Sequence, residues 1–150
     1  MLTFRDITLA DRELVMPMVQ AFYQTDAVDH PVDQAILDRS FLAAADHAEP
    51  LLRGVLLFQD KEPVGYIYLT QCYSAEVGGR CVFLEEIYLR PEFRGRGLGI
   101  EILTWIEKQY PTARRFRLEV NQINQGAVRL YEKAGYEYLR YEQMVIDKSK

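Results

Sequence analysis

The sequence predicts an α/β or α+β fold, formed by a single domain over residues 1–150. Three observations support this prediction. A chain of 150 residues, of which 49% are apolar, is long enough to bury one sizeable core. Stretches with apolar residues at helical spacing alternate with stretches of strand-like character. Their succession predicts the element order β-α-α-β-β-β-α-β-α-β.

The first third of the chain predicts one strand and two helices. Residues 2–7 form the strand, and Thr8 or Asp11 can cap the helix that follows. Pro17 removes one backbone hydrogen bond from this helix, so we expect a kink or a restart there. The second helix covers about residues 32–47. The apolar stripes of the two helices are Leu14, Met18, Ala21 and Phe22, and Leu37, Phe41, Ala44 and Ala45.

Strand patterns dominate the middle of the chain. Residues 52–58 and 64–73 predict an antiparallel pair joined by a turn, and residues 82–89 predict the next strand. This last stretch is rich in β-branched and aromatic residues, which is typical of a strand buried on both faces.

The end of the chain predicts a strand, a helix and a final strand. Residues 115–120 alternate between charged and apolar side chains. Asn124 is suited to cap the last helix, and Gly135 is suited to end it. Residues 136–146 carry the pattern of a closing strand.

A glycine-rich loop connects the strand at residues 82–89 to a helix and is the most informative part of the sequence. It reads Arg94-Gly95-Arg96-Gly97-Leu98-Gly99, and Ile102, Trp105 and Ile106 continue an apolar stripe from Leu98. Glycines let a ligand approach bare backbone N–H groups, and a helix N-terminus attracts anions. The loop therefore predicts a phosphate site, with Arg94 and Arg96 as additional donors.

The pattern Arg94-x-x-Gly97-x-Gly99 after an acid-bearing strand resembles the pyrophosphate loop of the GNAT superfamily of acyl-CoA-dependent N-acetyltransferases, Gln/Arg-x-x-Gly-x-Gly/Ala. Residues 124–136 resemble the family's Asn-x-x-Ala and Leu-Tyr-Glu-Lys-x-Gly-Phe helix, with Tyr136 in place of Phe. The resemblance covers roughly the C-terminal half. It implies a GNAT-like fold, with a central mixed, mostly antiparallel sheet, parallel and splayed fourth and fifth strands, and about four helices.

The resemblance also implies that acetyl-CoA is the acyl donor and assigns residues to it. The loop from Arg94 to Gly99 would hold the pyrophosphate. Backbone groups of Ile87, Tyr88 and Leu89 would pair with the pantetheine arm, as an added strand pairs with a sheet edge. The N–H of Leu89 or Tyr88 would face the thioester oxygen. Asn124 would contact the pantetheine arm, and Tyr131 would act as general acid toward the sulfur.

Two adjacent acids, Glu85 and Glu86, lie in a stretch that should be buried, where carboxylates rarely go unpaired. Regular alternation predicts that they point to opposite faces of the sheet. By comparison with polyamine-type family members, Glu85 is the general base and Glu86 a substrate-side acid. The alternatives for Glu85 are a salt bridge to Arg115 or Arg117, or substrate binding without proton transfer.

The loop after the first helix contains Asp26, Asp29 and His30, and the family's first two helices form a substrate wall. We therefore expect Asp26 and His30 to bind the substrate. The resulting hypothesis is an N-acetyltransferase that moves an acetyl group from acetyl-CoA to a primary amine of a small, cationic molecule by direct attack. The alternatives are an acyl-CoA-binding sensor without turnover and an enzyme that acetylates a protein or peptide.

Net charge, cysteine content and the N-terminal residues limit the classes of partner, metal site and location that we expect for this protein. A net charge of −4 argues against nucleic acid or an anionic membrane as the main partner. Cys72 and Cys81 are too few for a disulfide scaffold, and no cluster has metal-ligand spacing, so we expect no metal. The first residues lack the pattern of a signal peptide, which predicts a cytoplasmic protein with reduced thiols. Members of the family often pair through their last strand, so a homodimer is expected.

Overall fold

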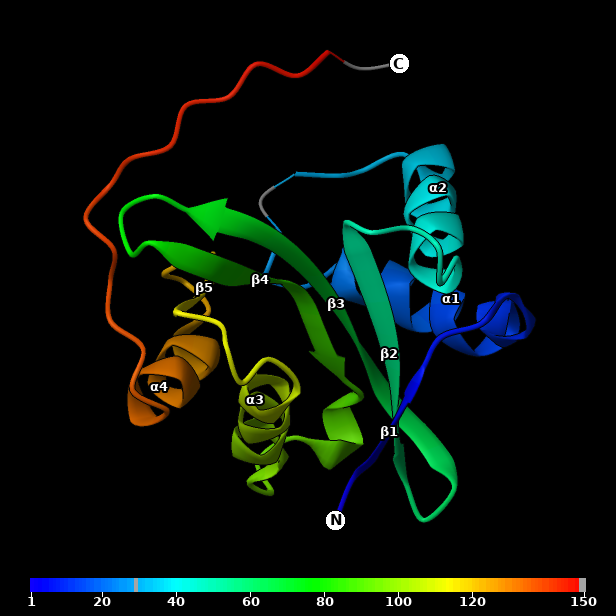
Figure 1. Cartoon of the computed structure of the whole chain (residues 1–150). Helices are drawn as coiled ribbons and strands as arrows, with labels where there is room; N and C mark the ends of the chain where they lie inside the picture. Colours follow the sequence, from blue (N-terminus) through cyan, green and yellow to red (C-terminus); the bar gives the residue numbers. More distant parts are fainter. Residues whose placement is uncertain (29, 149–150) are drawn as a thin grey trace.

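The computed structural model describes residues 1–28 and 30–148, and within them it contains a five-stranded sheet in the order β1-β2-β3-β4-β5 with helices on both faces (Figure 1). The elements are β1 (Thr3–Asp6), α1 (Arg12–Phe22), α2 (Gln34–Ala45), β2 (Leu52–Gln59), β3 (Glu62–Ser74), β4 (Gly79–Leu89), α3 (Leu98–Gln109), β5 (Arg115–Leu118) and α4 (Gln125–Lys133). Short 3-10 turns at Leu9–Asp11 and Pro91–Phe93 precede α1 and the glycine loop.

The sheet opens between its last two strands. Strands β1 to β4 pair antiparallel in chain order, whereas β5 lies parallel to β4. The β4–β5 pairing runs from Cys81 opposite Arg115 to Leu84 opposite Leu118 and stops there. Strand β4 continues to Leu89 while paired only with β3. The predicted mixed sheet with parallel, splayed fourth and fifth strands is thus confirmed.

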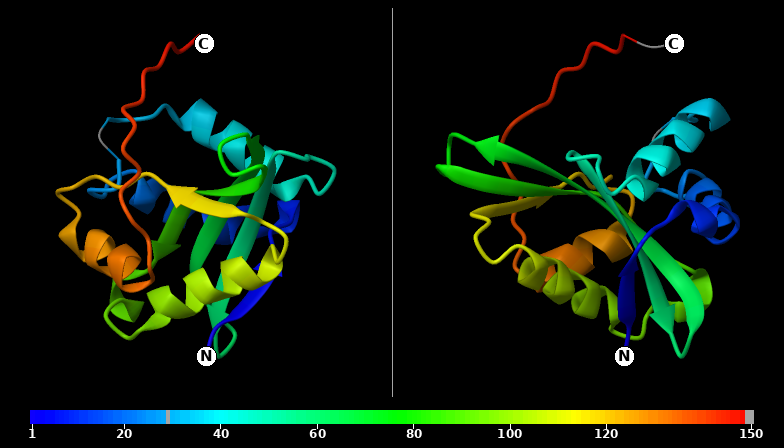
Figure 2. Two further views of the ribbon diagram at one scale, coloured as in Figure 1. Left: turned by 60° about the vertical axis from the view of Figure 1, so that its left-hand side comes forward. Right: turned by 45° about the vertical axis from the view of Figure 1, so that its right-hand side comes forward.

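The helices form two layers around the sheet. In Figures 1 and 2, α1 and α2 cover one face, and α3 and α4 cover the other. Each face has its own apolar core, because strand side chains alternate between the two faces. On the α1–α2 face lie Leu56, Tyr66, Tyr68 and Tyr88 among others, and on the α3–α4 face lie Leu57, Ile67, Leu69, Val82 and Leu84.

The predicted stripe of the second helix is correct, since Leu37, Phe41, Ala44 and Ala45 are all buried. The stripe of the first helix is wrong at Leu14, which is 39% exposed, whereas Val15 and Val19 are buried with Met18 and Phe22. Helix α1 begins at Arg12, after the 3-10 turn, and its buried side also includes Met16. It continues through the exposed Pro17 instead of restarting there.

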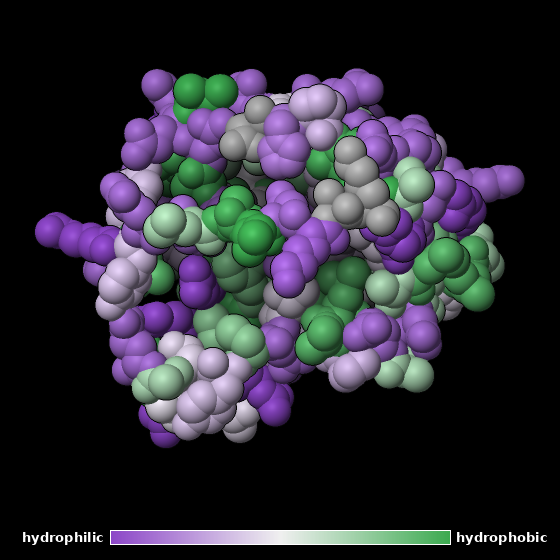
Figure 3. Space-filling view, turned by 90° about the horizontal axis from the view of Figure 1, so that it is seen from above, coloured by the Kyte–Doolittle hydropathy of each residue, from purple (hydrophilic) through white to green (hydrophobic). Residues whose placement is uncertain are grey.

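The expected closing strand does not form: residues 136–148 have no regular secondary structure, and most of their side chains are exposed. After Gly135, which has a φ of 99°, this segment leaves α4 and runs toward the tip of the β3–β4 hairpin (Figure 1). There Tyr141 donates a hydrogen bond to Glu76. A strand-like composition needs a partner edge to become a strand. This segment passes near the start of β5, where Arg115 also pairs with Glu76, but it does not pair with the outer edge of that strand. Figure 3 views the molecule from above and shows patches of hydrophobic residues among hydrophilic ones on that upper face.

Candidate active site

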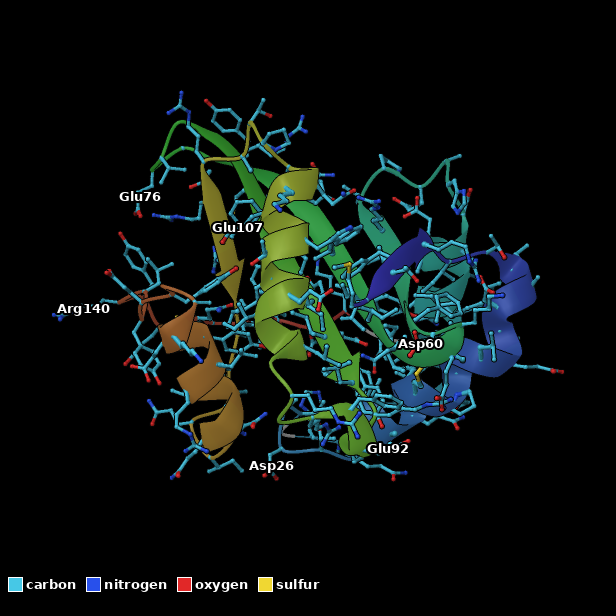
Figure 4. The ribbon with its side chains drawn as sticks, turned by 90° about the horizontal axis from the view of Figure 1, so that it is seen from below. Asp26, Asp60, Glu76, Glu92, Glu107 and Arg140 are labelled. Atoms are coloured by element: carbon cyan, nitrogen blue, oxygen red, sulfur yellow. The ribbon has the colours of Figure 1, made fainter. Side chains whose placement is uncertain are left out.

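A cavity of about 1230 Å³ lies where the α1–α2 loop, the end of β4, the start of α3 and helix α4 meet. The candidate site residues from the sequence line this cavity, with the exception of Arg96. The lining residues among them are Asp26, His30, Glu85, Glu86, Ile87, Tyr88, Leu89, Arg94, Gly95, Gly97, Leu98, Gly99, Asn124 and Tyr131. Figure 4 shows Asp26 at the same end of the molecule as Glu92, which belongs to the turn before the glycine loop. Asp29 lies outside the described residues.

The glycine loop has the backbone conformation that an anion site requires. Gly95 and Gly97 have φ angles of 75° and 79°, in the left-handed region that favours glycine. A Cβ atom at either position would meet nothing within 4 Å. Glycine is therefore needed there for its conformation, and the space beside the backbone stays open to a ligand. Gly97 is also the N-cap of α3 and offers no side-chain cap to the first N–H groups.

Arg94 has a structural contact in addition to its predicted role. Its Nε donates a hydrogen bond to the carbonyl oxygen of Leu89 at 2.8 Å, and its guanidinium lies 5.4 Å from the Tyr88 ring centroid. Arg94 therefore ties the glycine loop to the end of β4. Arg96 instead places its guanidinium 5.3 Å from the Phe93 ring centroid, outside the cavity lining.

Gly99 brings the two helices of one face together. A Cβ atom there would lie 2.7 Å from a methyl carbon of Leu130 on α4. The absence of a side chain thus allows α4 to approach α3, and α4 carries Tyr131 toward the cavity. The motif predicts glycine at this position, but the packing reason for it appears only in the structure.

The open edge of β4 presents backbone groups to the cavity. Arg90 donates its backbone N–H to Val64 on β3 at 2.8 Å. Because backbone groups alternate in direction along a strand, those of Leu89 and Ile87 face the open edge, and those of Tyr88 face β3. The carbonyl of Tyr88 indeed lies so close to Gly65 that a Cβ there would be 2.1 Å from the oxygen. Of the two predicted donors to a thioester oxygen, the geometry favours Leu89.

A β-bulge places both adjacent acids on the same face of the sheet, which corrects the prediction of opposite faces. On β3, Tyr68 pairs with Glu86 and the next residue, Leu69, pairs with Leu84, so Glu85 is an extra residue. Leu84 and Ile87 both pack on the α3–α4 side, and the two acids between them lie on the α1–α2 side. Nothing in the sequence of β4 alone marks this bulge.

Glu86 is held by two tyrosines. Its carboxylate accepts hydrogen bonds from the Tyr23 hydroxyl at 2.5 Å and from the Tyr66 hydroxyl at 2.6 Å. Burial raises the pKa of Glu86, and the two hydroxyl donors oppose that effect. Tyr23, the residue that ends α1, also lines the cavity. No local pattern predicts this role of Tyr23, because Tyr23 and Glu86 are 63 residues apart in the chain.

Glu85 has much weaker contacts. It accepts a hydrogen bond from the Thr70 hydroxyl at 3.3 Å, and the enclosed position of its carboxyl group raises its pKa, with a further contribution from Glu119. Among the described residues it forms no salt bridge to either predicted arginine. Arg115 pairs with Glu76 at 2.8 Å, and Arg117 lies over the Phe83 ring.

Helix α4 supplies the last two predicted groups. Asn124 caps the helix as predicted, because its side-chain oxygen accepts a hydrogen bond from the N–H of Ala127 at 3.3 Å. Its amide NH₂ is therefore the part left to contact a ligand. Tyr131 is half-buried in the cavity wall, with its ring centroid 5.9 Å from that of Tyr136. Burial raises the pKa of Tyr131 to about 12, so its hydroxyl remains a donor throughout the neutral range.

Residues 1–28 and 30–148 lack a metal-ligand cluster and a membrane-spanning helix. Those residues contain no group of three or more His, Cys, Asp or Glu side chains placed to hold a metal ion. Over the same part of the chain, none of the helices has both the length and the apolarity needed to cross a membrane.

The comparisons with known proteins agree with this geometry. A profile of the acetyltransferase (GNAT) family matches residues 15–136. The thialysine N-epsilon-acetyltransferase of Sus scrofa is 38% identical over 74 residues, which are 48% of this chain and 43% of that protein. The match therefore spans less than half the length of this curated relative.

Solved structures share the whole fold. An integron cassette protein from the mobile metagenome of Cole Harbour Salt Marsh is 27% identical with a TM-score of 0.73, over 98% of this chain and 91% of that one. A structure from Clostridium acetobutylicum, described as a predicted acetyltransferase with acetyl-CoA, has a TM-score of 0.76 at 15% identity, over 97% and 96% of the chains. From its matched profile, its sheet and its glycine loop, the chain belongs to the acetyltransferase (GNAT) family.

Proposed function

We propose that the protein is an acetyl-CoA-dependent N-acetyltransferase that acetylates a primary amine of a small, cationic molecule by direct attack. The observation that carries this proposal is the convergence of three features on one cavity. These features are the glycine loop at the start of α3, the open edge of β4, and the pair formed by Glu85 and Tyr131. A binding module would need the loop and the edge, but it would not need an acid–base pair.

The acyl donor fits the residues that are present. The left-handed Gly95 and Gly97 and the uncapped N–H groups of α3 suit a pyrophosphate. The open edge of β4 at Ile87 and Leu89 offers backbone partners to the pantetheine arm, and the NH₂ group of Asn124 can contact the same arm. The N–H of Leu89 stabilises the negative charge that develops on the thioester oxygen.

The remaining groups move protons. The amine nitrogen attacks the carbonyl carbon, so a C–N bond forms and the C–S bond breaks. Glu85 accepts the proton that the amine loses, and its raised pKa brings it closer to the working pH of a base. Tyr131 acts as general acid toward the sulfur, first as hydrogen-bond donor and then as proton donor. Tyr131 then takes up a proton from solvent, and Glu85 releases the proton of the amine to solvent.

Acidic groups in the cavity support a cationic acceptor. Glu85, Glu86, Glu119 and Asp26 all line it. The name of the Sus scrofa relative, thialysine N-epsilon-acetyltransferase, specifies an amine acceptor, which supports the same reaction class here. We take an amine with a positive charge beyond the reacting nitrogen as the substrate class.

We also propose a cytoplasmic location and a homodimer. The location is supported by Cys72 and Cys81, which lie directly opposite each other on β3 and β4 and are both free thiols. The dimer is supported by the exposure of large apolar side chains in the segment of residues 136–148, where Met144 is 99% and Ile146 81% exposed. Light scattering after gel filtration measures the mass: twice the chain mass supports the dimer, and the mass of one chain refutes it.

The experiment that tests the activity measures free CoA with a thiol reagent. Purified protein is mixed with acetyl-CoA and a panel of polyamines, amino acids, aminoglycosides and short peptides. We expect release that depends on a cationic amine and is lost in Glu85→Gln. Binding of acetyl-CoA without release across the panel would instead identify a sensor, and release with peptides alone would identify a peptide acetyltransferase.

A further inference from the structure

Glu86 has a more rigid environment than a substrate-side acid needs. Each of its two carboxylate oxygens accepts one hydroxyl donor, from Tyr23 at the end of α1 and from Tyr66 on β3. Because each bond holds a different oxygen and comes from a different part of the fold, the two bonds together restrict the position and the rotation of the carboxylate. A carboxylate that accepts two hydroxyl donors is also favoured in its charged form.

Aromatic packing keeps the two hydroxyls in place. The Tyr23 ring packs edge-on against Phe22 with centroids 5.2 Å apart, and the Tyr66 ring packs against Tyr68 at 5.0 Å and Tyr88 at 6.0 Å. Tyr66 and Tyr68 are almost completely buried. Tyr66 therefore cannot turn away from Glu86 without disturbing the core on the α1–α2 face, whereas Tyr23 is half-buried at the cavity wall and packs against Phe22.

The bulge makes Glu85 the contrasting neighbour. It lies on the same face of the sheet and lines the same cavity, yet among the described residues its side chain accepts a hydrogen bond only from Thr70, at 3.3 Å. Glu85 can therefore accept a proton without breaking a strong contact, whereas protonation of Glu86 would disturb the hydroxyl bond at the protonated oxygen. Glu85 and Glu86 therefore suit different roles, because only the carboxylate of Glu86 is held by two short hydrogen bonds.

We propose that Tyr23 is a positioning and specificity-determining residue, which holds the carboxylate of Glu86 in place for a second ammonium group of the acceptor while Glu85 takes the proton from the reacting amine. The inference rests on the proposed function. It assigns the α1–α2 loop a defined part in selectivity, because the loop starts at the residue that holds the recognition acid. The acceptor is then at least a diamine, and a monoamine of the same length is a poor substrate.

The test compares 1,4-diaminobutane with butylamine as acceptors over pH 6 to 9. The wild-type protein should prefer the diamine through a lower KM. Tyr23→Phe keeps the ring and removes the hydroxyl, so it should raise KM for the diamine about tenfold or more and leave kcat with butylamine within about twofold. Tyr138→Phe, on an exposed ring outside the cavity, is the matched control.

The pH dependence separates positioning from a packing defect. The groups that face Glu86 are Tyr23 from α1, Tyr66 and Tyr68 from β3, and Glu85 from its own strand. Loss of one donor raises the pKa of Glu86 further, so Glu86 becomes neutral at a higher pH. The KM defect of Tyr23→Phe for the diamine should therefore grow as the pH falls, and a structural defect would not follow this profile.

Glu86→Gln provides a second variant of the same size without the negative charge. Its carboxamide oxygen can accept from one tyrosine hydroxyl, whereas its NH₂ group must donate to the other. The variant should abolish the preference for the diamine at every pH. Equal turnover of the two amines by the wild-type protein, or equal losses for both amines in Tyr23→Phe, would overturn the inference and leave the proposed function intact. Absence of turnover with any amine would instead refute the proposed function.

Discussion

Replacement of Tyr131 by phenylalanine tests how the leaving sulfur is stabilised. The substitution removes one hydroxyl from the half-buried wall of the cavity and keeps the ring that packs near Tyr136. Burial raises the pKa of Tyr131 to about 12, whereas an ordinary thiol has a pKa of about 8.5. Complete proton transfer from the tyrosine to a free thiolate is thus uphill by about 3.5 pKa units, or about 5 kcal/mol at about 1.36 kcal/mol per unit.

The main contribution of Tyr131 is therefore the hydrogen bond that it donates while charge develops on the sulfur, and proton delivery follows late. Loss of one such donor in other enzymes lowers kcat by about 10²–10³-fold, and we expect the same range for Tyr131→Phe, with little change in KM for acetyl-CoA. The wild-type kcat should show no alkaline decline up to pH 10, because the pKa of Tyr131, about 12, keeps its hydroxyl protonated there.

Steady-state release of CoA, followed from pH 7 to pH 10, measures both quantities. Tyr136→Phe is the matched control, because Tyr136 is the neighbouring ring and its buried hydroxyl has no partner among the described groups. Its loss should leave kcat unchanged. The reasoning is refuted if Tyr131→Phe has the wild-type kcat, or if the wild-type protein has an alkaline decline below pH 10 that this variant lacks.

Three further predictions concern the loop, the helix contact and the base. Gly97→Ala places an alanine at a left-handed φ of 79°, although its Cβ would meet no neighbouring atom. The variant should therefore lower the free energy of unfolding by about 1–2 kcal/mol in urea titrations. An unchanged free energy of unfolding would contradict the conformational argument. Gly99→Ala should be destabilising because its Cβ meets Leu130, and Leu130→Ala should relieve part of that cost. A double-mutant cycle from urea titrations should therefore depart from additivity by about 1 kcal/mol, whereas additive effects would show that the two helices do not meet there. Because burial raises the pKa of Glu85, kcat/KM should fall as the pH decreases through a pKa above that of an ordinary glutamate. Glu85→Gln should lose this acidic limb of the pH profile together with most of its activity. An acidic limb that persists in Glu85→Gln would belong to another group.

The sequence was informative where structure depends on neighbours along the chain. The succession of β4, the glycine loop and α3 could be predicted because each part is set by residues within a few positions, such as the left-handed Gly97 at the start of α3. The cap at Asn124 follows the same logic, since it bonds to a backbone group three residues away.

Features that depend on distant partners could not be predicted. The bulge at Glu85 arises from a shift in the β3–β4 register between Tyr68 and Leu69. It is therefore a property of the paired strands, and the sequence of one strand does not define it. The bond from Tyr23 to Glu86 likewise depends on how α1 lies over the sheet. For the segment of residues 136–148, local composition favoured a strand, but the segment does not pair with the outer edge of β5, the last strand of the sheet.

The bulge has a consequence for how this chain can change over generations. Residues on both sides of Glu85 keep consecutive partners on β3, because Leu84 pairs with Leu69 and Glu86 with Tyr68. Deletion of the single codon for Glu85 would therefore restore a regular ladder without shifting any other pair. The descendant would keep the sheet, the glycine loop and the cavity while losing the proposed base. One in-frame deletion thus separates an enzyme from a ligand-binding protein of the same shape.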